Sequence, residues 1–182
     1  MTLRRGEMTN QMHSLQRSSF RLTNQRYSRP GTYLVTANTF QFDGLFGEIV
    51  KGRMRYNHLG MIVRQAWLDL PVRFAHVALD AFCVMPNQVH GTIILIGDLT
   101  VRERIKRPGL PEIMLAFKSI SAQWINDFRK TPGLPIWQQN YHRRVVGSHA
   151  EVDRVREAIE NQPLIWRMDV EQSFSILPIE AR

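Results

Sequence analysis

Two apolar runs separated by a Pro-Asn turn constrain the fold of this chain more than any other feature. Residues 74–84 and 89–96 are rich in branched and aromatic side chains, and Pro86 and Asn87 lie between them. Apolar runs of this length, bounded by turn residues, predict two strands that pair as an antiparallel hairpin. Any fold of this chain must therefore be built around a sheet that contains this hairpin.

The rest of the chain alternates further strands with amphipathic helices. Branched and aromatic runs predict strands at 33–40, 45–50, 53–56 and 145–146. Apolar residues at steps of three and four predict helices at about 58–70 and 111–130, and the pattern Ser148-x-x-Glu151 predicts a capping box for a third helix that ends near 162. The stripe of the second helix includes Trp124 and Phe128, which assigns both to the core. This order predicts an α+β fold, an antiparallel sheet with helices packed on one face.

Charge is unevenly distributed along the 182 residues, which carry a net charge of +8. Six Arg oppose one acid in residues 1–30, and nine Lys or Arg oppose three acids in residues 99–147. Residues 31–98 are balanced at five against five, and residues 148–182 carry four against seven. Two basic segments around a neutral core favour binding to a nucleic-acid backbone, although a basic surface can equally serve solubility alone.

Length and composition indicate a single domain with a substantial core, because 43% of the residues are hydrophobic. Residues 1–20 are polar and basic and are expected to form a disordered arm. No apolar run is long enough to span a membrane, so no membrane partner is expected. The single Cys83 excludes an internal disulfide and is expected to be buried and unreactive, which fits a reducing cytoplasm.

Gln88 and His90 carry the most informative chemistry in the chain. They are two residues apart on a predicted strand, so both side chains project from the same face and can hold one metal ion. From Met85 the chain reads Met-Pro-Asn-Gln-Val-His, which resembles the Met-Pro-Asn-His-x-His signature of the single-tyrosine HUH transposases, including the REP-associated tyrosine transposases. Gln88 stands where this family has its first histidine.

The resemblance extends from about residue 20 to residue 166, so we expect a transposase-like domain at 21–166 and a C-terminal tail at 167–182. Matching segments are Leu45-Phe46-Gly47-Glu48-Ile49-Val50, Asn57-x-x-Gly60-x-Ile62-Val63, Phe117-Lys118-Ser119, Ile136-Trp137-Gln138-x-Asn140-Tyr141 and Arg154-Val155-Arg156. The resemblance implies the ferredoxin-like (RRM-like) HUH fold, with single-stranded or hairpin DNA as partner, and leaves monomer or homodimer open.

The resemblance also implies a reaction and its residues. In the family, a tyrosine on the last helix attacks a phosphodiester of single-stranded DNA, and Mg²⁺ or Mn²⁺ positions the phosphate. Here Ala158 occupies the position of that tyrosine, and alanine has no attacking oxygen. The metal ligands implied are Gln88, His90 and Gln162, whose amide and imidazole groups would hold a divalent cation weakly. Without the resemblance, Gln88 reads as a surface residue and His90 as a hydrogen-bonded strand histidine.

Two short segments are candidates for DNA binding because they bring positively charged side chains together, and the second also has an aromatic ring. Their residues are Arg102, Arg104, Lys106, Arg107, Tyr141, His142, Arg143 and Arg144. The tyrosines of the chain are Tyr27, Tyr33, Tyr56 and Tyr141. Tyr141 is the one that could serve as a relocated nucleophile, although a packed or base-stacking role is the simpler interpretation.

Three functions remain open from the sequence. The first is a transposase-type enzyme that cuts and joins single-stranded DNA near hairpins. The second is a pseudoenzyme that keeps DNA-hairpin recognition without cleavage. The third is a transposase relic that folds but has lost its role. Because Ala158 lacks a nucleophilic oxygen, the residues favour impaired catalysis.

Overall fold

The computed structural model describes residues 29–41, 43–97 and 107–166. Four strands form an antiparallel sheet in the order β4-β5-β1-β6. They are β1 (Gly31–Asn38), β4 (Val77–Met85), β5 (Gln88–Leu95) and β6 (His142–Val146). A separate hairpin pairs β2 (Gly47–Val50) with β3 (Arg53–Tyr56). The predicted hairpin across Pro86 and Asn87 is confirmed as β4–β5, with Met85 opposite Gln88.

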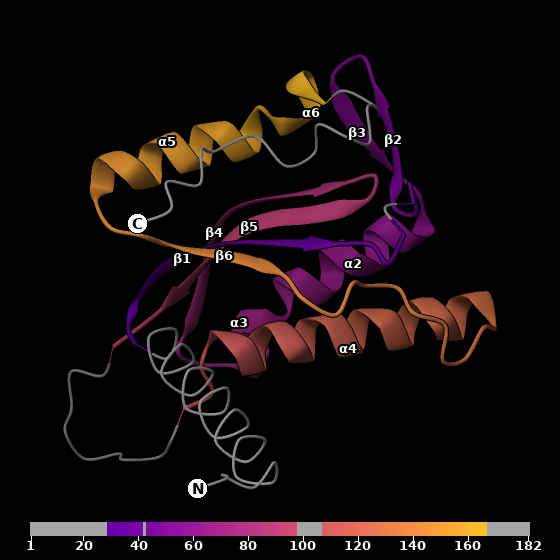
Figure 1. Ribbon diagram of the computed structural model, residues 1–182, viewed down its shortest axis with the longest axis horizontal. Coiled ribbons are helices and arrows are strands. Elements are labelled where there is room, and N and C mark those ends of the chain that lie inside the picture. The colour runs from indigo at the N-terminus through magenta and orange to yellow at the C-terminus, as the bar shows by residue number, and fades with distance from the viewer. Residues whose placement is uncertain (1–28, 42, 98–106, 167–182) are drawn as a thin grey trace, which may run out of the picture.

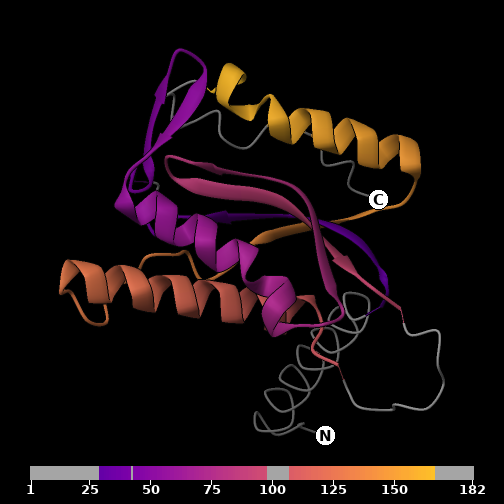
Figure 2. The ribbon, with the colours of Figure 1, turned by 180° about the vertical axis from the view of Figure 1, so that it is seen from behind.

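The helices are α2 (His58–Leu68), α3 (Leu70–Arg73), α4 (Leu110–Arg129), α5 (His149–Glu160) and α6 (Gln162–Ile165). α2 and α4 lie side by side under one face of the sheet, and α5 crosses the opposite face (Figures 1 and 2). The α+β fold is therefore confirmed, with the two helices predicted at 58–70 and 111–130 packed together on one face. α5 adds a layer on the other face. None of the helices in the described residues is long and apolar enough to cross a membrane.

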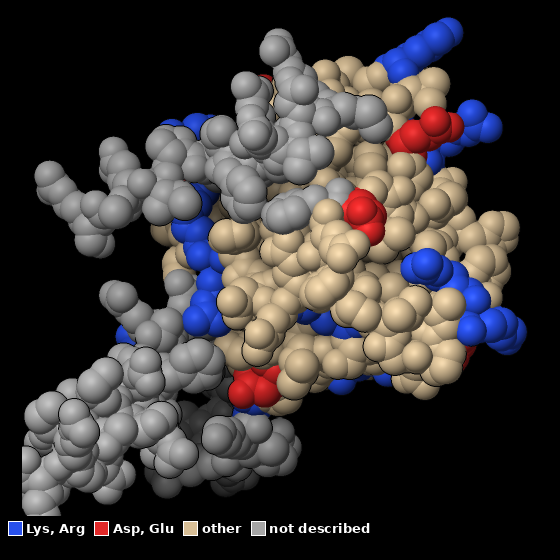
Figure 3. Space-filling model, turned by 45° about the vertical axis from the view of Figure 1, so that its right-hand side comes forward, with Lys and Arg blue, Asp and Glu red and all other residues tan. Residues whose placement is uncertain are grey.

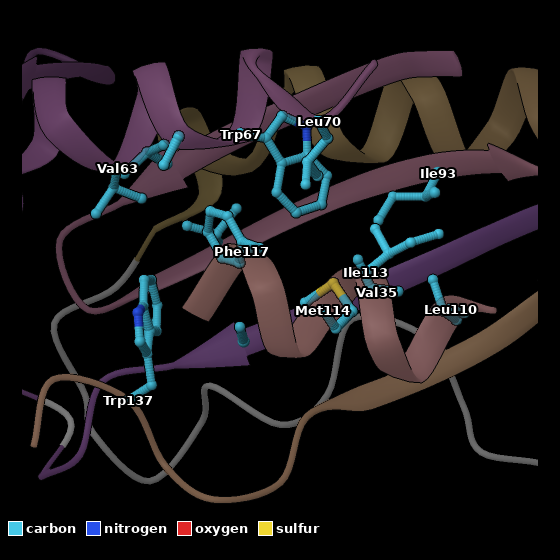
Figure 4. Close-up of a cluster of buried hydrophobic side chains, with 14 of the residues drawn as sticks. Val35, Val63, Trp67, Leu70, Ile93, Leu110, Ile113, Met114, Phe117 and Trp137 are labelled. Carbon is cyan, nitrogen blue, oxygen red and sulfur yellow. The ribbon is translucent and has the colours of Figure 1, made fainter. Parts of the chain in front are cut away.

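The main core lies between the sheet and the α2–α4 pair (Figure 4). Alternation along β1 sends Tyr33, Val35 and Ala37 into this core. The indole of Trp67 packs edge-on against Phe117, with 5.2 Å between the ring centroids. Trp67 also lies so close to β5 that a Cβ added at Gly91 would be 2.5 Å from its ring. Glycine at this position therefore lets the helix layer approach the sheet.

Local sequence signals set several element boundaries. Asn57 caps α2, since its side chain accepts a hydrogen bond from the Gly60 N–H at 2.9 Å. Residues 74–76, predicted as strand, precede β4, and the chain forms the short helix α3 before them, with Pro71 in its first turn. The edge strand predicted at 145–146 begins earlier, at His142.

The predicted stripe of α4 is rotated relative to the observed one. Phe128 is 54% exposed and stacks on His58 at 5.3 Å, so its assignment to the core was wrong. The buried positions are instead taken by Ser121, Ile125 and Asn126. Two of these residues are polar, and hydrogen bonds to the segment that follows α4 satisfy them. A pattern based on hydrophobicity alone cannot find such positions.

The α5 helix begins after Ser148 as predicted, whereas its capping box and its last residue differ from prediction. Ser148 accepts a hydrogen bond from the Glu151 N–H at 3.2 Å, which is half of the predicted capping box. The Glu151 carboxylate does not return to Ser148; it accepts from the Gly147 N–H at 2.7 Å and pairs with Arg144. The helix ends at Glu160 instead of continuing to 162.

Candidate metal and nucleic-acid site

Strand register places four side chains in one row across the sheet. Cys83 lies opposite His90, His90 opposite Thr36, and Thr36 opposite His142. Directly opposed residues of an antiparallel sheet project from the same face. This is the face beneath α5, because Cys83 belongs to the small cluster that contains Val155 and Ile159 of that helix. The chain's own last long helix therefore covers the row that contains His90.

His90 is the central side chain of this row. Its Nδ1 lies 2.8 Å from Thr36 Oγ1, and its Nε2 is enclosed without a hydrogen-bond partner among the described residues. Burial, and then the nearby His142, lower the pKa of His90 to about 4. The imidazole is therefore neutral near pH 7. A half-buried, neutral imidazole whose enclosed Nε2 has no partner among the described residues has the electronic form required of a metal ligand.

Gln88 lies one step along the same face, at the start of β5. It is only 3% exposed, so its interpretation as a surface residue is wrong. Its register partners are Met85 on β4 and Asn38 on β1, both of which are also buried. Two buried amides, Gln88 and Asn38, thus lie side by side next to the His90 row. His90 does make the hydrogen bond that the simpler interpretation of a strand histidine requires.

Ala158 and Gln162 come from the layer above this face. Val155 and Ile159 are the buried residues of α5, and Ala158 is partly buried beside them. Gln162 is 3% exposed and begins α6, which lies next to the β2–β3 hairpin and β4 (Figure 1). The structure thus places Gln88 and His90 on the sheet face that α5 covers, and Gln162 where the chain leaves that helix.

Ion pairs hold α5 against the sheet at two points. Arg156 donates two hydrogen bonds to the Asp80 carboxylate on β4, at 3.2 and 3.1 Å, and a third to Asp153 at 3.0 Å. At the other end of the helix, Arg144 of β6 pairs with Glu151. These contacts link α5 to both edge strands of the sheet, because β4 and β6 are the outermost strands.

The donor atoms present fit a divalent cation only in part. No group of three or more His, Cys, Asp or Glu side chains in the described part of the chain could hold a metal ion. The candidate donors are the Nε2 of His90, which has no partner among the described residues, the buried amides of Gln88 and Asn38 on the same face, and the buried amide of Gln162 at the start of α6. Cys83 does not extend this set, because burial raises the pKa of its thiol to about 12. The prediction of an unreactive cysteine agrees with this shift.

The residues predicted to bind DNA fall into three groups. Arg102, Arg104 and Lys106 lie outside the described residues, and Arg107 is exposed. On β6, Arg143 donates a hydrogen bond to the Tyr141 hydroxyl at 3.2 Å, and its guanidinium lies 5.6 Å from the centre of the ring. Figure 3 shows Lys and Arg side chains in several separate groups on the displayed face.

Tyr141 and His90 lie on opposite faces of the sheet. Arg143 is opposite Val35, a residue of the main core, and Tyr141 packs against that core as well. His142 and Arg144 alternate to the α5 face. An attack by Tyr141 on a phosphate held at His90 would therefore have to cross the sheet, and a packed or base-stacking role agrees better with its position. Tyr33 is buried, and its hydroxyl donates to the Arg29 carbonyl at 2.7 Å.

Thr36 and Asn38 are the residues of this face that the sequence did not identify. Both lie on a correctly predicted strand, but only the pairing of β1 with β5 brings them beside His90 and Gln88. Their polarity in an otherwise apolar strand was the available signal. Polar side chains at alternate positions of a buried strand indicate that one of its faces differs from the other.

Comparison with known proteins supports the fold assignment. No protein-family model matches the chain. An uncharacterized protein of Haemophilus influenzae is 29% identical over 166 residues, which cover 84% of this chain and 91% of the relative. The fold resembles that of a REP-associated tyrosine transposase bound to a REP hairpin. The TM-score is 0.53 at 16% identity, over 76% of this chain and 69% of the other.

A second solved structure, of a candidate transposase from Deinococcus radiodurans R1, has a TM-score of 0.45 at 21% identity. It covers 75% of this chain and 93% of that structure. The likeness to the first of these two structures concerns the α+β fold, with a four-stranded antiparallel sheet and packed helices.

Proposed function

We propose that the protein binds single-stranded or hairpin DNA and cleaves it little or not at all. The observation that carries the proposal is the position of Ala158. Its helix covers the sheet face that presents His90, yet its side chain is a methyl group with no oxygen to attack a phosphodiester. Binding itself is supported by the fold shared with a hairpin-bound transposase and by the basic residues of β6.

A divalent cation has a limited role in this proposal. Mg²⁺ or Mn²⁺ would be held by the Nε2 of His90 and the amide oxygens of Gln88 and Gln162, and would neutralise charge on a bound phosphate. Replacing an imidazole by an amide at position 88 removes a stronger ligand, so weak metal binding is part of the proposal. The chain's own cations would then supply most of the affinity for DNA.

Covalent capture with a labelled hairpin oligonucleotide tests the proposal. Unmodified protein should shift the oligonucleotide on a native gel without leaving an adduct on a denaturing gel. Affinity should fall with salt, and neutralising roughly six phosphates predicts a slope of log K against log salt of about −4 to −5. An affinity that does not change between low and physiological salt would exclude binding through phosphates.

Restoring the missing groups sharpens the same experiment. Ala158→Tyr combined with Gln88→His should give an adduct, since the phenol returns the nucleophile and the imidazole returns a ligand. Ala158→Phe with Gln88→His is the matched control, because it adds the same ring without the oxygen. If the unmodified chain cuts DNA and Tyr141→Phe abolishes the cut, the protein is an enzyme with a relocated nucleophile.

A further inference from the structure

The side chain of Lys118 ends in a cage of backbone carbonyl groups. From the middle of α4, its Nζ donates hydrogen bonds to the carbonyls of Gln138, Gln139 and Asn140, the last two at 2.9 and 3.3 Å. An ammonium group has three N–H donors, and each has a carbonyl partner here. Burial lowers the pKa of Lys118, so the cage surrounds a partly desolvated cation.

Two further side chains of α4 hold the same segment. Ser121 accepts a hydrogen bond from the Trp137 indole N–H at 2.9 Å and donates one to the Phe117 carbonyl at 2.7 Å. Asn126 donates to the Leu134 carbonyl at 2.9 Å. The chain from residue 134 to 140 is therefore fixed along the helix by Lys118, Ser121 and Asn126. Figure 4 shows Trp137 next to Phe117 of this helix.

This segment runs directly into β6. Among the described residues, that strand is at the edge of the sheet and pairs with β1 alone. Its first residues follow the last carbonyl of the cage, and the paired Tyr141 and Arg143 come immediately after. The orientation of that pair depends on β1 from one side and on the segment held by α4 from the other.

We propose that Lys118 is a positioning residue whose ammonium, as the resident cation of a three-carbonyl cage, sets the Tyr141–Arg143 pair for contact with DNA. The DNA part rests on the function proposed above. The charge matters because three carbonyl dipoles that converge on one point repel each other unless a cation lies between them. Carbonyl cages of this kind also replace the hydration shell of small monovalent cations.

Chemical rescue distinguishes this role from simple packing. Lys118→Ala removes the ammonium and leaves space for a free one. Amide hydrogen exchange over residues 138–143 should become about tenfold faster, as expected for the loss of a charge-assisted contact. Ammonium chloride should slow the exchange again, whereas tetramethylammonium chloride at equal ionic strength should not, because that cation is too large. Arg129→Ala, an exposed charge loss at the end of the same helix, is the control.

Lys118→Met gives a second variant that keeps the aliphatic packing and loses only the charge. It should speed exchange as Lys118→Ala does, without rescue by ammonium. Unchanged exchange in both variants, or equal effects of the two salts, would overturn the cage as a cation site. Because exchange is measured without DNA, this result does not depend on the proposed function.

Hairpin binding then tests the consequence for DNA. Lys118→Ala should weaken binding about tenfold, and ammonium should restore it relative to tetramethylammonium. If Lys118→Ala speeds hydrogen exchange but leaves the affinity for the hairpin unchanged, the proposed role in positioning residues for DNA is wrong. The carbonyl cage would still be a cation site. If the unmodified protein does not bind hairpin DNA at all, the proposed function fails and the positioning role for DNA fails with it.

Discussion

The two faces of the sheet differ in how much apolar surface they bury. The face toward α2 and α4 buries aromatic and aliphatic side chains in one continuous core. The face toward α5 has a small cluster in which only Val155 and Ile159 of the helix are buried. Enclosed nitrogen atoms without a hydrogen-bond partner among the described residues occur on both faces, the Nε1 of Trp67 in the main core and the Nε2 of His90 and Nε of Arg144 on the second face. Those of the second face belong to side chains that can carry a charge.

This difference concerns where the stability of the fold resides. An unsatisfied buried nitrogen costs free energy, and a fold tolerates it where another part of the molecule supplies the stability. The α2–α4 face supplies it here through extensive apolar burial. The α5 face combines a smaller apolar cluster with the enclosed ionisable side chains of His90 and Arg144.

The largest expected effect of a single change lies in the main core. Phe117→Ala removes a fully buried ring between Trp67 and Trp137. It should lower the free energy of unfolding by about 3–5 kcal/mol, because it leaves a cavity between rigid neighbours. Urea denaturation measures this.

On the other face, Ile159→Ala should lower the free energy of unfolding by about 2 kcal/mol. It should mainly speed amide hydrogen exchange in α5. Equal losses of unfolding free energy in Phe117→Ala and Ile159→Ala would contradict the difference in packing between the two faces.

A pH-dependent loss of stability should come from the α5 face. The pKa of His90 is about 4 in the fold, below the usual value of about 6.5. The fold favours the neutral imidazole, so the stability linked to His90 is complete above about pH 6.5. It is lost as pH falls, by about 3 kcal/mol at pH 4. Urea titrations between pH 7 and pH 4 measure this.

His90→Gln should flatten this pH profile, since an amide does not titrate. His149→Gln, at an exposed histidine in the first turn of α5, is the matched control and should leave the profile unchanged. An equally steep profile in the His90 variant would show that other groups cause the acid sensitivity.

The smallest expected effect tests the outer limit of the main core. Phe128→Ala should change the free energy of unfolding by about 0.5 kcal/mol or less, because the ring is exposed and contacts His58 by stacking. Thermal and urea denaturation measure this. A loss of unfolding free energy comparable to that of Phe117→Ala would show that the core extends to the end of α4.

The sequence alone determined most of the framework. Alternation and apolar runs identified the strands, because one buried face imposes a period of two on each. The Pro-Asn turn fixed the β4–β5 hairpin, and Asn57 fixed the start of α2 through its cap. These signals are local, so neighbouring residues carry them in full. The resemblance in the Met85–His90 stretch likewise marks His90 as a candidate metal ligand.

Tertiary structure alone decided which distant residues meet. Thr36 and His142 lie beside His90 only because β1 pairs with both β5 and β6. Ser121 became a buried polar residue, and Lys118 a half-buried one, because the segment at 134–140 returns along α4. Register and return paths depend on the free energy of the whole chain, and no local pattern encodes them. For that reason the sequence predicted His90 as a candidate ligand, whereas only the folded structure showed that Thr36 and His142 lie beside it.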